Sequence, residues 1–504
     1  MIDVREVGEY NSAHIPGSSN IPRRQIEFLM TRAAPYPGVE MVICDDDGQR
    51  AAMAADTLQE MGYRRVAVLD GGLNHWFTQG YSTEWGTNVP SKAFGEKMEV
   101  VHHLSLMDAT ELHERMEGGD PLLVLDARTP QEHQSFCVPG GRSLPAGEMA
   151  LRITDIRKEM GPEVTVLVHC AGRTRSIIGA RTLQRMGIEN VYALKNGTAG
   201  WMLAGYPLER GSDRLELPQV TPDGLAAAEK YTALLARDDG VEMLDLAALM
   251  TMMERLQEET IYFVDVRTEK EYRQGHIPGF GWFPGGQAVQ RSDEVTVVKN
   301  CPLVFCCDRR ARAVSTASWY RQMGFEEVYV VEGGTTQWET SGRTLEDSSA
   351  GTEPFGLEAA KRTVAPISAP QLKARESGLT LFVETSRDFA GAHVPGSYWV
   401  PRGWLEFQIE SVADGYETPI VVTCCDGQQS FLAGATLKKR GYLKVEVLDG
   451  GVQAWLNAGF ATEKGLSNLM STPTDVVTTG PNRNFADMMN YLRWEEALGE
   501  KELF

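Results

Sequence analysis

Short apolar runs alternate along the chain with segments whose apolar residues lie three or four positions apart. Residues 121–128 (PLLVLDAR), 165–170 (TVLVHC) and 190–196 (NVYALKN) are typical of buried β-strands. Residues 175–187 (RSIIGARTLQRMG) have the spacing of an amphipathic helix that ends at a glycine. This alternation predicts an α/β fold in which each sheet is mostly parallel and flanked by helices.

The same succession of motifs occurs four times, which indicates tandem homologous repeats. Each copy has a tetrapeptide close to HIPG and, further on, a glycine-containing turn that leads to a tryptophan. The tetrapeptides begin at His14, Cys137, His276 and His393, and the tryptophans are Trp76, Trp201, Trp338 and Trp455. Three copies carry an Asp-x-Arg motif upstream, formed by Asp3 with Arg5, Asp126 with Arg128 and Asp265 with Arg267, whereas the fourth copy reads Glu384-Thr385-Ser386.

We place the four repeats at residues 1–88, 104–211, 241–349 and 365–465. Residues 221–239 predict a connecting helix, and the C-terminal tail, residues 466–504, contains an amphipathic pattern that predicts a docked helix. The first repeat has only two residues before its Asp-x-Arg motif, whereas the others have roughly 20. Its sheet is therefore expected to be incomplete or to be completed by another segment.

Counting back from the glycine turn aligns one loop position in the four repeats. The residues 25 positions before the aspartate-like residue of that turn are Asp45, Cys170, Cys307 and Cys424. The residues five positions further on are Arg50, Arg175, Arg312 and Gln429. Only the second and third repeats combine a cysteine with an arginine, so the first repeat is predicted to be inactive and the fourth to have a degenerate loop.

Together, the Asp-x-Arg motif, the HIPG turn, the strand-to-cysteine loop and the glycine turn before tryptophan resemble the rhodanese homology domain. The resemblance covers nearly the whole chain as four tandem copies. It implies a parallel sheet flanked by helices and, in active members, a cysteine persulfide that carries sulfur. The donor would be an anion such as thiosulfate and the acceptor cyanide or a thiol, with no organic cofactor or metal.

The residues themselves support this chemistry. A cysteine between a buried strand and a helix N-terminus lies where backbone N–H groups converge, which favours the thiolate. Cys170, Cys307 and Cys424 are therefore the candidate nucleophiles. The arginines of the second and third loops, which we expect to bind the donor anion, are Arg173, Arg175, Arg309, Arg310 and Arg312. Asp308 directly follows Cys307 and is expected to raise the pKa of its thiol, which ranks Cys170 first.

Two other functions are compatible with parts of the pattern. Cys44 to Arg50 reads C-x5-R, the loop of the phosphatases that share the rhodanese fold, but the repeat register aligns Cys44 with the last residue of a strand, and three aspartates would repel phosphate. The second alternative is a non-catalytic sulfur relay or protein-binding scaffold, in which a protein donor supplies its own charges.

Several residues have structural interpretations. The four repeat tryptophans are predicted core anchors, the Asp-x-Arg pairs a buried charge network, and the histidines of the HIPG turns hydrogen-bonding residues. Packing roles are expected for Cys137, Cys301, Cys306 and Cys425.

Composition narrows the class of partner. The formal charge of −20 and the pI near 5.0 argue against a nucleic-acid or anionic-membrane surface. The first residues are charged and lack an apolar core, so we expect no signal peptide, no membrane span and a cytoplasmic location. Eight cysteines and nine scattered histidines predict free thiols and no structural zinc site. The sequence carries no signal for the oligomeric state.

Overall fold

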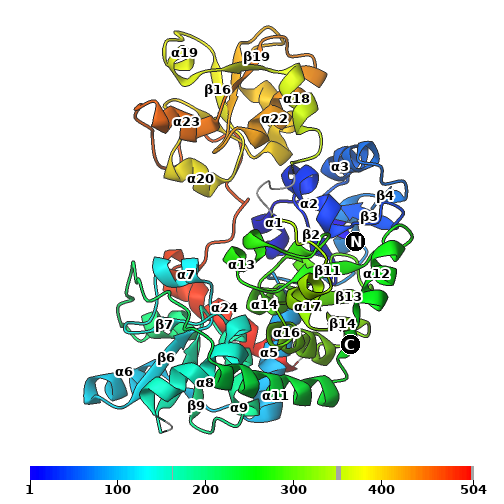
Figure 1. Ribbon diagram of the computed structural model, residues 1–504. Helices are drawn as coiled ribbons and strands as arrows, with labels where there is room; N and C mark the ends of the chain where they lie inside the picture. Colours follow the sequence, from blue (N-terminus) through cyan, green and yellow to red (C-terminus); the bar gives the residue numbers. More distant parts are fainter. Residues whose placement is uncertain (162, 348–352, 501–504) are drawn as a thin grey trace. The chain divides into compact units, whose positions relative to one another are not determined.

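The computed structural model describes residues 1–161, 163–347 and 353–500 (Figure 1). The chain divides into two compact units, one of Met1–Thr87 with Ala350–Val477 and one of Asn88–Ser349 with Thr478–Phe504. The first unit contains the first and fourth repeats, and the second unit contains the second and third. The predicted end of the third repeat, residues 348–349, and the last residues of the predicted tail, 501–504, lie outside the described residues.

The second repeat contains a five-stranded parallel sheet of order β5-β9-β8-β6-β7. Its strands are β5 (Leu106–Met107), β6 (Leu122–Asp126), β7 (Arg142–Ser143), β8 (Thr165–His169) and β9 (Val191–Leu194). Its helices are α6 (Ala109–Gly118), α7 (Pro130–Ser135), α8 (Met149–Met160), α9 (Thr174–Arg185) and α10 (Gly197–Leu203). The predicted strands and the predicted helix of this repeat are confirmed.

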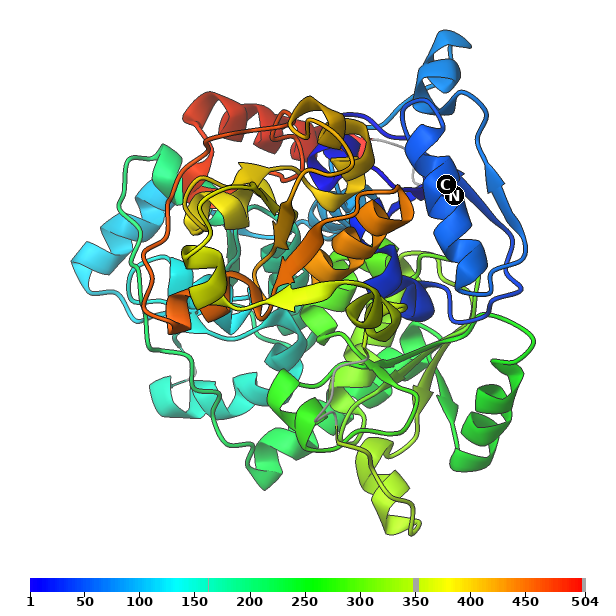
Figure 2. The ribbon, with the colours of Figure 1, turned by 90° about the horizontal axis from the view of Figure 1, so that it is seen from above.

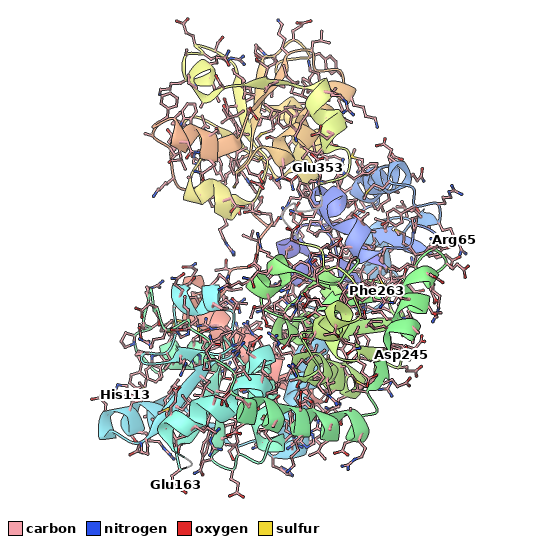
Figure 3. All side chains as sticks on the ribbon, in the orientation of Figure 1. Arg65, His113, Glu163, Asp245, Phe263 and Glu353 are labelled. Carbon is pink, nitrogen blue, oxygen red and sulfur yellow. The ribbon has the colours of Figure 1, made fainter. Side chains whose placement is uncertain are left out.

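The third repeat has the same sheet, in the order β10-β14-β13-β11-β12. Its strands are β10 (Glu242–Leu244), β11 (Tyr262–Asp265), β12 (Gly281–Trp282), β13 (Leu303–Cys306) and β14 (Val328–Val331). Its helices are α12 (Leu246–Arg255), α13 (Glu269–Gln274), α14 (Gly285–Gln290), α15 (Ser292–Val295), α16 (Ala311–Gln322) and α17 (Gly334–Thr340). Phe263, labelled in Figure 3, lies on β11 in the core of this repeat.

Three further helices belong to the same compact unit. They are α5 (Val89–His102), the predicted connecting helix α11 (Pro222–Asp238) and the predicted C-terminal helix α24 (Phe485–Ala497). Helix α11 packs against α8 of the second repeat and α16 of the third. Buried apolar side chains of both repeats therefore form one continuous core.

The fourth repeat has a five-stranded parallel sheet of order β15-β19-β18-β16-β17, with helices around its strands (Figure 2). Its strands are β15 (Ala365–Ile367), β16 (Leu379–Phe382), β17 (Tyr398–Trp399), β18 (Ile420–Thr423) and β19 (Val445–Leu448). Its helices are α18 (Leu357–Thr363), α19 (Ala369–Lys373), α20 (Ser386–Gly391), α21 (Leu405–Gln408), α22 (Gln428–Lys439) and α23 (Gly451–Asn457).

The first repeat has four strands in the order β2-β1-β3-β4, so the predicted incomplete sheet is confirmed. Its strands are β1 (Ile2–Asp3), β2 (Ser19–Asn20), β3 (Met41–Cys44) and β4 (Val66–Val68). Its helices are α1 (Val7–Ser12), α2 (Ile26–Ala33), α3 (Gln49–Glu60) and α4 (Gly72–Thr78). Among the described residues, β4 ends this sheet at the position where the other repeats add a strand.

The missing strand also changes the environment of the repeat tryptophan. Trp201, Trp338 and Trp455 are 2–5% exposed, as expected of core anchors. Trp201 packs in a cluster that includes Met107 and Leu112, which come from the strand and helix that the first repeat lacks. Trp76 is only half-buried. The prediction of a core anchor is therefore wrong for Trp76, because no described strand or helix of its repeat takes the place of β5 and α6.

The Asp-x-Arg motif forms the predicted buried charge network. Asp126 and Arg128 pair at 2.7 Å with both side chains fully buried, and the pairs in the first and third repeats have the same length. The arginine also donates to the carbonyl just before the tetrapeptide turn, which is Ala13 in the first repeat, Phe136 in the second and Gly275 in the third. This bond explains the fixed spacing of the two motifs. The buried ion pair and this hydrogen bond tie the strand end to the turn.

The histidines of the HIPG turns have the predicted structural role. The Nδ1 atoms of His14, His276 and His393 lie 2.7–3.1 Å from the carbonyl oxygen four residues earlier. Each imidazole also stacks on the aromatic ring of that earlier residue at 3.7–3.9 Å between centroids. No helix of the described chain is long and apolar enough to cross a membrane.

Truncation of the repeat tryptophan should separate the complete repeats from the first one. Trp201→Ala should lower the local free energy of unfolding by about 3–5 kcal/mol, because a fully buried aromatic side chain is lost. Trp76→Ala should lower the local free energy of unfolding by clearly less. Hydrogen exchange of β9 and β4, measured by mass spectrometry in both variants, gives the comparison. Equal losses of protection would contradict the proposed effect of the missing strand.

Stability should depend on the protonation of the buried His169. Burial lowers the pKa of His169 to about 4, whereas an unfolded histidine titrates near 6.5. The imidazole is thus neutral in the folded state, and its contribution, present above pH 6.5, is lost as the pH falls toward 4. The free energy of unfolding of His169→Asn and of the unaltered chain should be measured by denaturation between pH 4 and pH 6.5. Over this range the changes in the two free energies should differ by up to about 3 kcal/mol. Parallel pH curves would refute this assignment.

Candidate functional site

The predicted loop position follows the same strand in every repeat. The last strand residues Cys44, His169, Cys306 and Thr423 pair with Asp3, Asp126, Asp265 and Phe382 on the neighbouring strand. The next residues, Asp45, Cys170, Cys307 and Cys424, begin the loop that leads into a helix. The register obtained by counting is therefore confirmed.

The loop of the fourth repeat shows how backbone N–H groups surround the sulfur. The N–H of Gly427 lies 3.0 Å from Cys424 Sγ, and that of Ser430 lies 3.4 Å away. The Ser430 hydroxyl is 3.3 Å from the same sulfur. In the second repeat, Cys170 Sγ donates to Ser176 Oγ at 3.5 Å. Such a cradle stabilises a negative charge on sulfur.

In the first repeat a carboxylate occupies the cradle. Asp45 accepts the N–H groups of Gly48 at 2.5 Å, Arg50 at 2.7 Å and Ala51 at 3.2 Å. Cys44 lies inside β3 with 1% exposure, and burial raises the pKa of its thiol far above the usual range. The C-x5-R motif therefore does not present a nucleophile to the loop, as the repeat register predicted.

The three loop cysteines differ in their surroundings. Burial raises the pKa of Cys307 to about 12, and Asp308 raises it further while Arg312 opposes both. Burial and then Glu384 raise the pKa of Cys424 to about 12. Cys170 is followed by alanine and glycine instead of an acid. Acidic side chains thus act on Cys307 and Cys424, and the ranking of the three cysteines stays a prediction.

A loop arginine forms the same ion pair in three repeats. Arg175 binds Glu132 through both terminal nitrogens at 2.7 and 2.9 Å. The equivalent Arg312 binds Glu271 at 2.7 Å twice, and Arg50 binds Glu9 at 2.7 Å. Each glutamate is the third residue of the helix after the Asp-x-Arg strand and closes a capping box there. Because the first repeat has this pair without a nucleophile, it clamps the loop independently of catalysis.

The clamp leaves one donor of the arginine unused. The buried Nε groups of Arg175 and Arg312 have no hydrogen-bond partner within the described part of the chain. Arg175 also interacts electrostatically with Cys170. One N–H of Arg175 is thus left for an anion at the cradle. In the third repeat Asp308 accepts from Arg312 at 2.8 Å, which offsets the positive charge there.

The other predicted arginines lie elsewhere. Arg173 donates to Glu96 twice at 2.7 Å, and to Asn196 and Glu496 at 3.0 and 3.3 Å. All of its nitrogens are engaged away from Cys170. Arg309 is exposed and Arg310 is half-buried, and Arg309 reaches Cys307 through its backbone N–H. The structure therefore brings Arg175 and Arg312 to their loops, whereas Arg173 ties its loop to α5 and α24.

Sequence reasoning missed the hydroxyl and carboxylate partners of the loop. Ser176 and Ser430 lie six residues after their cysteines, a shared offset that could have indicated them. Glu132 and Glu271 share the spacing of a capping box, T-x-x-E. The proximity of α24 to the Cys170 loop had no signal in the sequence.

The remaining cysteines follow the predicted packing role in part. All eight cysteines are free thiols, and Cys137 and Cys306 are buried as expected. Cys301 is half-buried, and the packing prediction is wrong for Cys425, which is exposed. Cys425, Glu384 and Asp388 place possible metal-ligand atoms within 4.8 Å of one another. The Cys425 N–H donates to Glu384 at 2.6 Å, so hydrogen bonding alone accounts for that approach.

Comparison with known proteins agrees with this geometry. A thiosulfate sulfurtransferase from Pseudomonas aeruginosa, known from its crystal structure, superposes with a TM-score of 0.90 at 34% identity, over 99% of this chain and 93% of that one. A thiosulfate sulfurtransferase of Azotobacter vinelandii is 24% identical over 238 residues, which cover 40% of this chain and 87% of the relative. The yeast thiosulfate:glutathione sulfurtransferase is 30% identical over 91 residues, 16% of this chain and 66% of the relative.

The domain family matches four separate segments. The sequence profile of the rhodanese-like domain matches residues 1–79, 108–204, 247–341 and 373–458. These segments include each of the four loops and most strands of the four sheets, but not β5, β10 and β15. The chain belongs to the rhodanese-like domain family, with four tandem copies of the domain.

Proposed function

We propose that the protein is a sulfurtransferase that moves sulfane sulfur from thiosulfate or a similar anionic donor to cyanide or a thiol. The family match and the sulfurtransferase relatives support the general activity. The observation that carries the assignment to the second repeat is its loop, where Cys170 Sγ bonds the Ser176 hydroxyl at 3.5 Å and no acid follows the cysteine.

The reaction has two balanced steps. The Cys170 thiolate attacks the outer sulfur of thiosulfate, the S–S bond of the donor breaks, and sulfite leaves with the bonding electron pair. The product is a persulfide on Cys170. Cyanide or a thiolate then attacks the outer sulfur of the persulfide, and the Cys170 thiolate leaves. No metal or organic cofactor is required for either step.

The loop supplies the charge stabilisation that both steps need. Backbone N–H groups of the loop and the start of α9 favour an anionic sulfur. The free Nε–H of Arg175 adds one charge-assisted donor, while Glu132 fixes the direction of the guanidinium. Arg173 contributes to the architecture of the loop and not to donor binding in this proposal.

The other repeats contribute unequally. Asp308 offsets Arg312 beside Cys307, and Glu384 raises the pKa of Cys424, so the third and fourth repeats are weaker candidates. The first repeat, with Asp45 in its cradle, acts as a structural domain. A non-catalytic sulfur relay is the second candidate function, and the filled cradle of the first repeat favours it. Steady-state turnover with free thiosulfate distinguishes the relay from the enzyme.

Serine substitutions should rank the three cysteines. Cys170→Ser should remove most thiosulfate-to-cyanide activity, Cys307→Ser a smaller share, and Cys424→Ser little, because the local charges disfavour the last two thiolates. Since the sites lie in separate domains, the effects should be close to additive. Intact mass after incubation with thiosulfate, with peptide mapping, should locate the added sulfur on Cys170. Full activity of Cys170→Ser with an inactive Cys307→Ser would reverse the ranking.

Removal of the acid beside Cys307 should make that thiol more reactive. Asp308→Asn should lower the pKa of Cys307, because Asp308 raises it and also offsets Arg312. The rate of Cys307 alkylation by iodoacetamide near pH 8 should rise severalfold. Asp47→Asn, an exposed loop aspartate in the first repeat, is the charge-matched control. An unchanged rate in Asp308→Asn would show that burial alone limits the thiol.

A further inference from the structure

The C-terminal segment packs onto the second repeat through apolar contacts. Met488 and Leu492 of α24 are 3% and 2% exposed and form a cluster with Ala199 of α10. Leu498 packs with Val89 and Ala93 of α5. The segment is therefore part of the folded domain that holds Cys170.

This packing brings α24 over the loop that follows Cys170. A side chain at Gly172 would meet Glu495 Oε2 at 3.1 Å and Tyr491 Cε1 at 3.9 Å. The Thr174 hydroxyl donates to Glu495 at 3.4 Å. A side chain at position 172 would require the Glu495 carboxylate to shift slightly, so Tyr491 and Glu495 lie directly against this loop.

The arginines of the loop are already neutralised by carboxylates. Arg175 binds Glu132 with both terminal nitrogens, and Arg173 binds Glu96, Glu99 and Glu496. A dianionic donor therefore meets only the Nε–H of Arg175 as an available loop guanidinium donor. Full recognition of a sulfonate group, with three oxygens, calls for a further cation.

Arg483, in the segment before α24, supplies a cation beside Tyr491. Its guanidinium lies 4.5 Å from the centre of the Tyr491 ring, and its Nε donates to the Thr478 carbonyl at 3.1 Å. Within residues 1–161, 163–347 and 353–500, no carboxylate forms an ion pair with Arg483. Two terminal nitrogens of this side chain are thus left for another anion.

Arg483 and Cys170 lie in one electrostatic neighbourhood. Burial raises the pKa of Tyr491, Glu495 and Cys170 raise it further, and Arg483 and Arg175 oppose that rise. The Tyr491 ring contacts Arg483 at 4.5 Å and lies beside Gly172 in the loop that follows Cys170. Burial also raises the pKa of Glu495, while Lys92 and Arg173 oppose that rise.

We propose that Arg483 is a specificity-determining residue of the Cys170 site, where it binds the sulfonate end of an anionic sulfur donor together with Arg175 Nε. The inference rests on the proposed function for the donor and on the C-terminal packing for the geometry. Tyr491 holds the guanidinium by a cation–π contact. Helix α24 thereby places Arg483, which lies outside the sequence of the second repeat, at the Cys170 site.

Kinetics of the full-length chain test this role. Arg483→Gln should raise KM for thiosulfate about tenfold with little change in kcat, because one charge-assisted contact is lost. Arg483→Lys should give a KM for thiosulfate between those of the unaltered chain and Arg483→Gln. KM for cyanide should stay unchanged. Arg493→Gln, which changes an exposed arginine of α24, is the matched control and should leave all constants unchanged. An unchanged KM in Arg483→Gln, or an equal rise in Arg493→Gln, overturns the proposal.

A binding experiment separates this inference from the proposed activity. Sulfite should protect Cys170 from iodoacetamide, and Arg483→Gln should require about tenfold more sulfite for the same protection. Hydrogen exchange of α24 must be the same in the unaltered chain and in the variant, which shows that the helix stays packed. If Arg483→Gln loosens the helix, the protection experiment is decided with Arg483→Lys. If sulfite protects Cys170 but thiosulfate adds no sulfur to it, the anion-binding role of Arg483 stands and the proposed sulfurtransferase activity is refuted. Sulfur gain on Cys170 with equal protection in Arg483→Gln would refute the anion site alone.

Discussion

Buried backbone N–H groups at the end of the central strand need an acceptor, and the rest of the site follows from this requirement. The loops after β3, β13 and β18 each turn more than one N–H group toward a single side chain. In the fourth repeat the Cys424 sulfur accepts two of them, and in the first repeat the Asp45 carboxylate accepts three. A carboxylate fills the cradle permanently, whereas a thiolate fills it and remains able to react.

The charges around the loop explain why similar loops are not equivalent. The pairs of Arg50 with Glu9, Arg175 with Glu132 and Arg312 with Glu271 hold three loops in the same way. The loops differ in the acidic side chains around them. Asp308 binds Arg312 in the third repeat, and Glu384 raises the pKa of Cys424 in the fourth. An arginine in a motif thus serves first as a structural clamp, and only its remaining donor is available to a substrate.

Interactions between distant segments complete the second repeat. Arg173 looks like a substrate-binding residue in the loop sequence, yet it binds α5 and Glu496 of α24. Arg312 of the third repeat also binds Glu148 of the second at 2.9 Å. The two repeats and the C-terminal helix therefore share one hydrophobic core and one network of charges.

The sequence by itself determined the repeat number, the parallel α/β fold and the loop register, because these depend on local periodicity and constant spacing. It also predicted the incomplete first sheet, the helix at 221–239 and the Asp-x-Arg network. Only the tertiary structure decided the partners of long side chains. The exposure of Trp76 and Cys425, the ion pairs of Arg173 and Arg175, and the packing of α24 against the Cys170 loop depend on segments far apart in the chain. A motif specifies which charges are present, but folding decides which carboxylate neutralises each guanidinium.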